Sequence, residues 1–151
     1  RVDQADFEGG EGLEYRAALK AAVRETKEEA GLDIGESQLI HTAHWTTPPH
    51  LPRRFCTWFF MCPVSRAATV VVDNDEILEH RWITPQAALA ASKAEEIVLP
   101  QPTKETLKGI AQISSVKALL DWAASTPVHI FPDDSPFYRP QEMGYPLSEP
   151  C

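Results

Sequence analysis

The sequence lacks any long apolar segment, and none of its hydrophobic runs approaches the roughly 18 residues that cross a bilayer. It also lacks an excess of basic residues, because 14 Lys and Arg stand against 22 Asp and Glu, a formal charge of −8. That charge repels a phosphate backbone or an anionic lipid surface, so we expect neither a nucleic-acid polymer nor a membrane as partner. A small phosphorylated substrate stays compatible with the charge if a divalent cation mediates the contact.

Cysteine is scarce as well. The chain has only Cys56, Cys62 and Cys151, an odd number without a Cys-x-x-Cys pair. This pattern suits neither a zinc knuckle nor a redox motif, so we expect reduced thiols that pack as small hydrophobic side chains. No cationic and apolar leader is present at Arg1. We therefore expect an intracellular protein, cytoplasmic or organellar, whose natural N-terminus lies upstream of this residue.

The composition of the 151 residues is that of a folded chain, with 43 % hydrophobic and 24 % charged residues. This length and balance suit one domain with a real hydrophobic core. We expect the domain to span residues 1–131. Five of the last twenty residues are proline, which predicts an extended tail over 132–151.

Helical and strand-like patterns alternate within that domain. Residues 1–13 are rich in glycine and predict a loop, and a helix follows from Glu14, where apolar residues recur at steps of three and four. Gly31 predicts the end of this helix, since glycine enters the left-handed conformation without a Cβ penalty. Strands are predicted over 39–46, 54–62, 68–72, 77–83 and 128–131, an acidic turn over 72–76, and further helices over 86–93, 104–111 and 116–124.

Two details of these elements are specific enough to be tested. Thr84 and Thr103 precede the helices predicted over 86–93 and 104–111, and both are expected to cap them. The strand over 54–62 is aromatic on both faces, which predicts a central strand that is covered from both sides.

The most informative stretch is 24–32, R-E-T-K-E-E-A-G-L. Glu25, Glu28 and Glu29 stand at i, i+3 and i+4, so their carboxylates share one helical face near the helix end. Like charges repel at that spacing, and the negative end of the helix dipole adds to the cost. A bound Mg²⁺ or Mn²⁺ would relieve this repulsion, with Arg24 holding a carboxylate in place. The alternative is a solvated acidic face without a ligand.

This stretch resembles the second half of the Nudix box, G-x5-E-x7-R-E-U-x-E-E-x-G-U, where U is a bulky aliphatic residue. The matching residues are Arg24, Glu25, Glu28, Glu29, Gly31 and Leu32. Thr26 departs from the pattern, being polar in an aliphatic slot. The resemblance implies an α/β fold, namely an α/β/α sandwich with a mixed sheet, whose box glutamates bind Mg²⁺ or Mn²⁺. It also implies hydrolysis of a nucleoside diphosphate linked to another group.

The first half of the box fits less well. Gly10 takes the glycine slot, but the glutamate slot falls on Arg16, with Glu14 two residues away. We interpret this as an insertion. The start of the chain is similar to the sequence after a Phe-Pro-Gly-Gly motif in the branch that includes coenzyme A diphosphatases. Stretches 44–48, 52–55, 59–60 and 99–103 resemble that branch too. The glycine pair would then precede Arg1, and this chain would lack N-terminal strands of the sandwich.

Other polar and aromatic residues carry weaker signals. Arg53 and Arg54 are candidates to hold substrate phosphates, with a salt bridge at a strand start as the alternative. Glu76 is a candidate for the same site from a later loop, as in other Nudix proteins, with a plain acidic turn as the alternative. The remaining residues considered are His44, His50 and His80, interpreted as ordinary polar residues; Trp45, either a base-stacking or a core residue; and Trp58, interpreted as a core residue.

Together these signals predict a metal-dependent pyrophosphohydrolase in which water attacks phosphorus in line. Glu25 and Glu29 are the expected principal metal ligands, Glu28 is a third ligand or orients the water, and Arg24 positions the carboxylates. The substrate would be a nucleotide or a coenzyme A-like molecule. The competing hypothesis is an inactive Nudix-like module that binds a nucleotide or a protein partner, for which Arg16 in the glutamate slot argues. A third hypothesis is an interaction domain whose acidic helix is solvated and binds no ligand.

Overall fold

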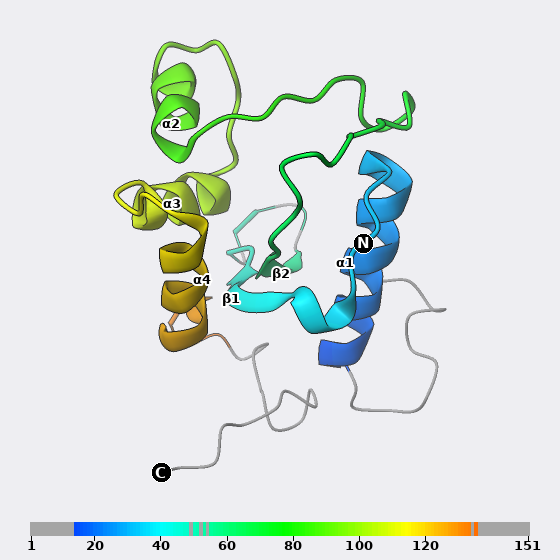
Figure 1. Ribbon diagram of the computed structural model, residues 1–151. Coiled ribbons are helices and arrows are strands. Elements are labelled where there is room, and N and C mark those ends of the chain that lie inside the picture. Colours follow the sequence, from blue (N-terminus) through cyan, green and yellow to red (C-terminus); the bar gives the residue numbers. More distant parts are fainter. Residues whose placement is uncertain (1–13, 49, 52, 54, 134, 136–151) are drawn as a thin grey trace.

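The computed structural model describes residues 14–48, 50–51, 53, 55–133 and 135 (Figure 1). The elements follow in the order α1 (Glu14–Ala30), the 3₁₀ turn η2 (Glu36–Gln38), β1 (Ile40–Thr46), β2 (Cys56–Met61), α2 (Pro85–Lys93), α3 (Gln101–Ile110), α4 (Val116–Ser125) and β3 (His129–Phe131). The predicted loop over 1–13, the side chain of Arg54 and the tail from 136 onward lie outside the described residues. Among the helices that are described, none has the length and apolar character needed to span a membrane.

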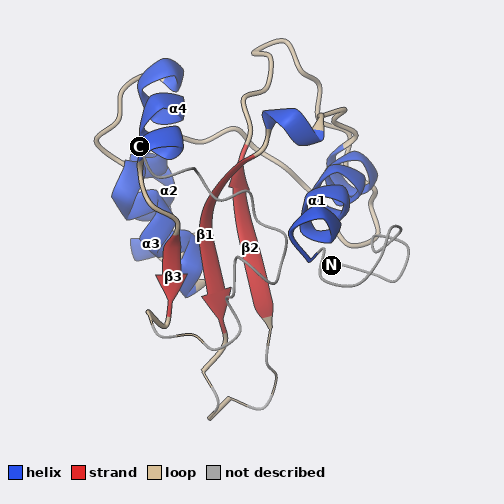
Figure 2. Cartoon of the chain, turned by 90° about the horizontal axis from the view of Figure 1, so that it is seen from below, coloured by secondary structure: helices blue, strands red, loops and turns tan. Residues whose placement is uncertain are grey.

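The three strands form a mixed sheet in the order β2-β1-β3. β1 pairs with β2 in antiparallel and with β3 in parallel orientation. Figure 2 shows the sheet between α1 on one side and α2, α3 and α4 on the other. The expected α/β architecture with a mixed sheet is therefore confirmed.

Helix α1 forms as the apolar periodicity predicts, and its buried residues are three alanines and a leucine, Ala17, Ala18, Leu19 and Ala21. It ends where the sequence places the stop: Gly31 has φ +67°, and its N–H donates to the Lys27 carbonyl at 3.0 Å. The chain then returns to this helix end much later, because the N–H of Val71 donates to the Ala30 carbonyl at 2.9 Å. The acidic end of α1 is thus fixed by a contact that is distant in sequence.

Replacing Gly31 by alanine is expected to lower the free energy of unfolding by about 1–2 kcal/mol, because an L residue is strained at positive φ. An added Cβ would also lie 3.1 Å from the Val71 Cβ and 3.2 Å from its carbonyl oxygen. Gly109 in α3 is the matched control, since a Cβ there meets no heavy atom within 4 Å. Gly109→Ala should stabilise by about 0.5–1 kcal/mol through helix propensity. Urea unfolding measures both, and equal changes would contradict the assignment of Gly31 as the helix stop.

The central strand is β1, which corrects the expectation for the aromatic strand. All residues from His41 to Thr46 are buried, whereas β2 lies at the edge of the described sheet and its first residues are exposed. Aromatic side chains on both faces of β2 therefore do not require burial on both sides. Its partner β1 takes that position because β3, remote in sequence, pairs with its other edge.

A register shift between His41 and Ala43 interrupts the β1–β2 pairing. In a regular strand, residues three apart point to opposite faces. The irregularity instead brings His41 opposite Phe60 and His44 opposite Trp58, so that both histidines contact the Trp58 ring, at centroid distances of 4.8 and 5.0 Å. Tyr15 of α1 packs onto the same rings, 6.0 Å from His41. This face of the sheet is the one that α1 covers.

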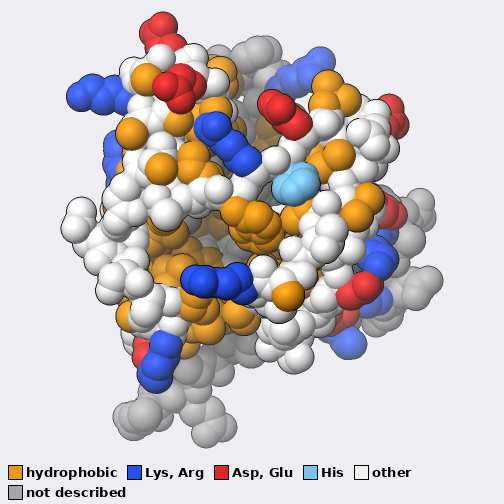
Figure 3. All heavy atoms as spheres, turned by 45° about the horizontal axis from the view of Figure 1, so that its top comes forward, with side chains coloured by type: hydrophobic (Ala, Val, Ile, Leu, Met, Phe, Trp, Pro, Cys, Tyr) orange, Lys and Arg blue, Asp and Glu red, His pale blue; other side chains and the backbone are white. Residues whose placement is uncertain are grey.

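The strands predicted over 68–72 and 77–83 are wrong. The described residues contain no sheet partner for either stretch, and a β-branched sequence without a partner forms no ladder. Their apolar side chains stay exposed, among them Val71 at 63 %, Leu78 at 74 % and Trp82 at 65 %. Figure 3 shows hydrophobic side chains gathered in a hollow of the molecule's surface, with Lys and Arg side chains beside it.

The acidic turn over 72–76 does form, although it does not join two strands. The Asp73 carboxylate accepts hydrogen bonds from the backbone N–H groups of Asp75, Glu76 and Ile77. These bonds, above all the one from Ile77, hold the pKa of this carboxyl below its usual value.

Helix caps agree with the sequence in one of the two expected cases. Thr84 accepts a hydrogen bond from the Ala87 N–H, with Pro85 in the first turn, as predicted. Thr103 is not a cap, because α3 already begins at Gln101, and Pro102 fits its first turn, where a missing N–H costs nothing. At the end of the fold, Ser135 is buried and its hydroxyl lies 3.0 Å from that of Thr46. The chain therefore stays against the sheet beyond β3.

Candidate functional site

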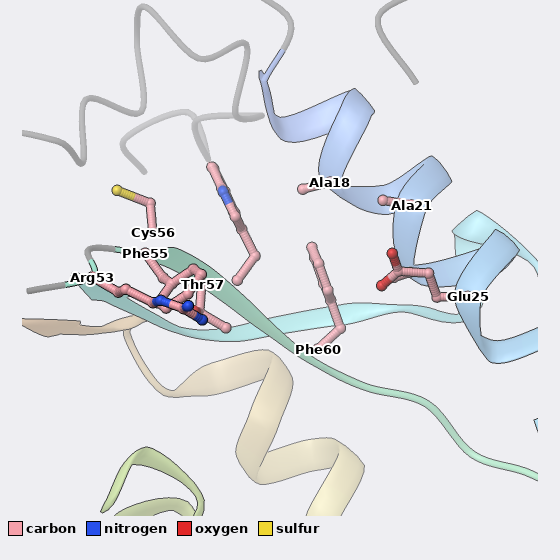
Figure 4. Close-up of a pocket in the computed structure, with 10 residues that line it drawn as sticks. Ala18, Ala21, Glu25, Arg53, Phe55, Cys56, Thr57 and Phe60 are labelled. Atoms are coloured by element: carbon pink, nitrogen blue, oxygen red, sulfur yellow. The ribbon is translucent and has the colours of Figure 1, made fainter. Parts of the chain in front are cut away.

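A cavity of about 750 Å³ lies between α1 and β2 (Figure 4). One wall contains three alanines of the helix, Ala18, Ala21 and Ala22. The other wall comes from β2 and the residues just before it, with Phe55, Trp58 and Phe60 among them. Glu25 and Arg53 are the charged residues that line it. A second cavity of about 590 Å³ lies between β1, α3, α4 and β3, and none of the predicted site residues lines it.

The acidic cluster at the end of α1 is organised around one arginine. Arg24 donates from Nη1 to Glu28 Oε2 at 2.9 Å and from Nη2 to Glu25 Oε1 at 3.4 Å. Glu25 is 28 % exposed and its side chain points from α1 into the cavity (Figure 4), whereas Glu28 is 58 % exposed. Glu29 is half-buried, and its side chain makes no hydrogen bond or ion pair with the described residues. The predicted pairing of Arg24 with a neighbouring carboxylate is thus present.

The three carboxylates do not form a preassembled metal centre. Within the described part of the chain, no three His, Cys, Asp or Glu side chains are grouped so that they could hold one ion. Their chemistry nevertheless suits Mg²⁺ or Mn²⁺, because all three offer hard oxygen donors from one helical turn and Glu25 faces a cavity open to solvent. The donor set fits a divalent cation, and binding requires the side chains to turn toward a common point.

The weaker candidates are dispersed. Arg53 is exposed and lines the cavity, while the side chain of Arg54 lies outside the described residues. Glu76 is exposed in the turn over 72–76 and does not line the cavity. It follows Val71, which is anchored to the end of α1, so this turn lies at the same end of the molecule as the acidic cluster. Trp58 belongs to the ring cluster with His41 and His44, in keeping with a packing role.

The interpretation of His44 as an ordinary polar residue is wrong. Its side chain is fully buried, and His41 is only 5 % exposed. Burial lowers the pKa of both imidazoles from 6.5 to about 4, and for His41 the neighbouring His44 lowers it further while a hydrogen bond with the Ala43 carbonyl opposes the shift. Both rings are therefore neutral at pH 7. No sequence signal marked this pair, because a spacing of three does not place two residues on one face of a regular strand.

The alanine wall of the cavity was also missed. Alanines at helical spacing indicate a packed helix face, and only the structure shows that this face lines a cavity. Exposed Phe55 entered the sequence analysis only as part of the stretch 52–55 and was not singled out as a site residue, because 54–62 was interpreted as a strand. The structure thus places one predicted metal ligand, Glu25, and one predicted phosphate-binding residue, Arg53, at opposite ends of one largely apolar cavity (Figure 4).

Comparisons with known proteins support the family that the acidic motif of α1 indicates. A sequence model of the NUDIX domain matches residues 5–101, more than half of the chain. The chain is 31 % identical over 81 residues to acyl-coenzyme A diphosphatase NUDT19 of Xenopus laevis and 31 % identical over 77 residues to acyl-coenzyme A diphosphatase NUDT19 of Homo sapiens. It is 29 % identical over 80 residues to putative nudix hydrolase 7 of Caenorhabditis elegans.

These alignments cover 51 %, 50 % and 53 % of this chain but only 21 %, 20 % and 27 % of the respective relatives. The chain thus spans about a fifth to a quarter of the length of those proteins. No solved structure matches it. The family match includes the whole of α1 with its Arg-Glu-x-x-Glu-Glu motif, and the fold has the mixed sheet expected with it. The chain belongs to the Nudix family.

Proposed function

We propose that this chain carries the catalytic helix of a metal-dependent Nudix hydrolase that cleaves the diphosphate of a nucleoside diphosphate linked to another group. The single observation that supports this most is the position of Glu25, a box glutamate that points into the cavity beside α1 (Figure 4). The names of two relatives, acyl-coenzyme A diphosphatases, make coenzyme A derivatives the first substrates to test.

Each motif residue has a definite task in this proposal. Glu25 and Glu29 are the principal ligands of Mg²⁺ or Mn²⁺, and Glu28 is a third ligand or orients the attacking water. The cation, when bound, neutralises the diphosphate and lowers the pKa of a bound water. Arg24 holds Glu25 and Glu28 through its two terminal nitrogens. Its charge holds these carboxylates toward one helix face, as positioning residues do at metal sites.

The test is turnover of coenzyme A, ADP-ribose, NADH and diadenosine polyphosphates by this chain within its full-length protein. Each substrate is assayed with Mg²⁺, with Mn²⁺ and with EDTA. We expect hydrolysis of at least one diphosphate with either metal and its loss in EDTA, because the carboxylates alone cannot neutralise the substrate. Hydrolysis that persists in EDTA would contradict the metal-dependent mechanism, and the absence of hydrolysis by a folded protein would contradict the enzyme.

One observation favours a second candidate, a Nudix module that binds a nucleotide without cleaving it. Arg16 occupies the strict glutamate slot of the box and is exposed in the first turn of α1, where it supplies no carboxylate. This candidate predicts saturable binding of ADP-ribose, measured by calorimetry, with no product formed in the presence of metal.

A further inference from the structure

The second cavity, of about 590 Å³, lies on the other side of the sheet from α1, between β1, β3 and the helices α3 and α4 (Figure 2). Its volume is in the range of small-molecule sites, and its walls combine apolar side chains with a few polar groups, as the walls of such sites do. None of the residues of the Nudix motif over 24–32, all of which the structure describes, lines it. The proposed hydrolysis therefore does not account for this cavity.

The charged residues in the lining are both acidic, Glu105 of α3 and Asp133, which follows β3. No lysine or arginine is among the described residues that line the cavity. Two carboxylates repel a phosphate group and attract a positive one. The charge of the lining thus argues against a second site for a diphosphate and favours a cationic ligand.

The Glu105 carboxylate has one oxygen in use and one available. Its Oε1 accepts hydrogen bonds from Gln101 Nε2 at 2.7 Å and from Lys108 Nζ at 2.9 Å, both within α3. Its Oε2 makes no hydrogen bond with the described residues. Because the first oxygen is held in place, the second can accept a hydrogen bond from a ligand at a small cost in side-chain entropy.

Asp133 supplies a carboxylate from a segment that is fixed against the sheet. The Ser135 N–H donates to the Pro132 carbonyl at 2.9 Å, and the Ser135 hydroxyl lies 3.0 Å from that of Thr46 in β1. Asp133 itself is exposed, and its side chain makes no hydrogen bond or ion pair with the described residues. This carboxylate is therefore available to a ligand in the cavity.

Trp122 of α4 gives the same cavity an aromatic wall. A cation over the face of an indole is attracted by the quadrupole of the ring, and tryptophan is the best aromatic side chain for this contact. Ala43 of β1 and Ile130 of β3 add apolar surface from the sheet. The cavity thus offers carboxylates to a positive group and an apolar surface to the hydrocarbon chain that carries it.

From these observations we infer that the cavity between the sheet and the helices α3 and α4 binds an aliphatic ammonium ion. Asp133 and Glu105 accept hydrogen bonds from its ammonium group, and its hydrocarbon chain packs on Trp122 and the apolar residues of the sheet. A metal ion is a poorer fit, since no three His, Cys, Asp or Glu side chains in the described part of the chain are grouped to hold one. The inference goes beyond the proposed hydrolysis and does not depend on it.

Calorimetry with n-hexylammonium on the full-length protein tests the site. At about pH 8 and about 0.15 M salt, histidine side chains are neutral, the amine is charged, and the attraction between distant charges is screened. We expect saturable binding that Asp133→Asn weakens about 5- to 10-fold, through loss of a charge-assisted hydrogen bond. Trp122→Leu should weaken it about 3- to 10-fold by removing the contact of the cation with the ring.

The matched control is Asp121→Asn, the same change at an exposed aspartate of α4 that lies outside the lining. It should bind n-hexylammonium as the unmodified protein does. Equal affinity in Asp133→Asn and Asp121→Asn would mean that the net negative charge of the protein attracts the cation, and it would overturn the site. The absence of saturable binding would overturn it as well. Because Asp133 is exposed, its substitution should leave the fold intact, which keeps the test valid if Trp122→Leu does not fold.

Three further ligands separate the ammonium site from other kinds of site. Hexan-1-ol has the same hydrocarbon chain without the charge and should bind more weakly than n-hexylammonium; equal binding would indicate an apolar cavity without selectivity for a cation. Adenosine should not displace n-hexylammonium, since displacement would indicate that Trp122 and the carboxylates recognise a base and a ribose. Displacement by Mg²⁺ would indicate a metal site and would likewise contradict the inference.

Discussion

Glu29→Gln is expected to reduce metal-dependent hydrolysis by about 100-fold or more while leaving the fold unchanged, since even indirect support of metal ligands contributes 10- to 100-fold. Glutamine keeps the size of the side chain and removes its negative charge, so a ligand for a hard cation is weakened. Stability should not suffer, because the Glu29 side chain makes no hydrogen bond or ion pair with the described part of the chain. A substitution of this kind changes the free energy of unfolding by about 0.5 kcal/mol or less.

The matched control is Glu36→Gln, an exposed glutamate of η2 that lies outside the motif and the cavity lining. Kinetics at several Mg²⁺ concentrations separate the effects, since loss of a ligand raises the metal concentration needed for half-maximal rate. Turnover of Glu29→Gln equal to that of Glu36→Gln would refute the assignment of Glu29. Equal loss in both variants, with altered urea unfolding, would indicate a general defect of folding.

What the sequence predicts well is local. The extent of α1, its end at Gly31 and the cap at Thr84 depend on backbone preferences within a few residues, and each is found in the structure. The chemical motif is local too, because one helical turn is enough to put Glu25 and Glu28 beside Arg24.

The features that the sequence does not predict depend on pairing between remote segments. The stretches over 68–72 and 77–83 have the composition of strands, but a strand also requires a partner, and composition carries no information about that partner. The same holds for the centre of the sheet: β1 becomes central through β3, which lies more than eighty residues later. The cavity follows from how α1 rests on this sheet, so its alanine wall could not be found from helical spacing alone.

The buried histidine pair is the clearest case of a property created by pairing. The register shift in β1 places His41 and His44 on one face, under α1, where they are 5 % and 0 % exposed. Neither carries a charge at pH 7, since burial lowers the pKa of each to about 4. Two imidazoles in one ring cluster thus make the packing of α1 on the sheet sensitive to acid.

Acidification is therefore expected to destabilise the protein well above the pH at which carboxylates titrate. Between pH 6.5, the pKa of the unfolded residues, and about 4, the unfolded chain binds more protons than the native one. Each imidazole makes its full contribution to the free energy of unfolding above this pH window. The contribution falls as the pH drops through the window and changes no further below it. From pH 7.5 to 5 the loss is on the order of 2 kcal/mol for each ring.

Urea unfolding at a series of pH values measures this loss, and two variants isolate its source. His44→Phe should flatten the dependence by about half, since the ring remains and the titration is removed; His41→Phe serves if that variant does not fold. His50→Asn changes an exposed histidine and should retain the full dependence. Carboxylate titration is common to all these proteins, so it cancels in the differences between them. A pH dependence in His44→Phe that equals that of His50→Asn would mean that the buried pair does not control the acid stability of the sheet.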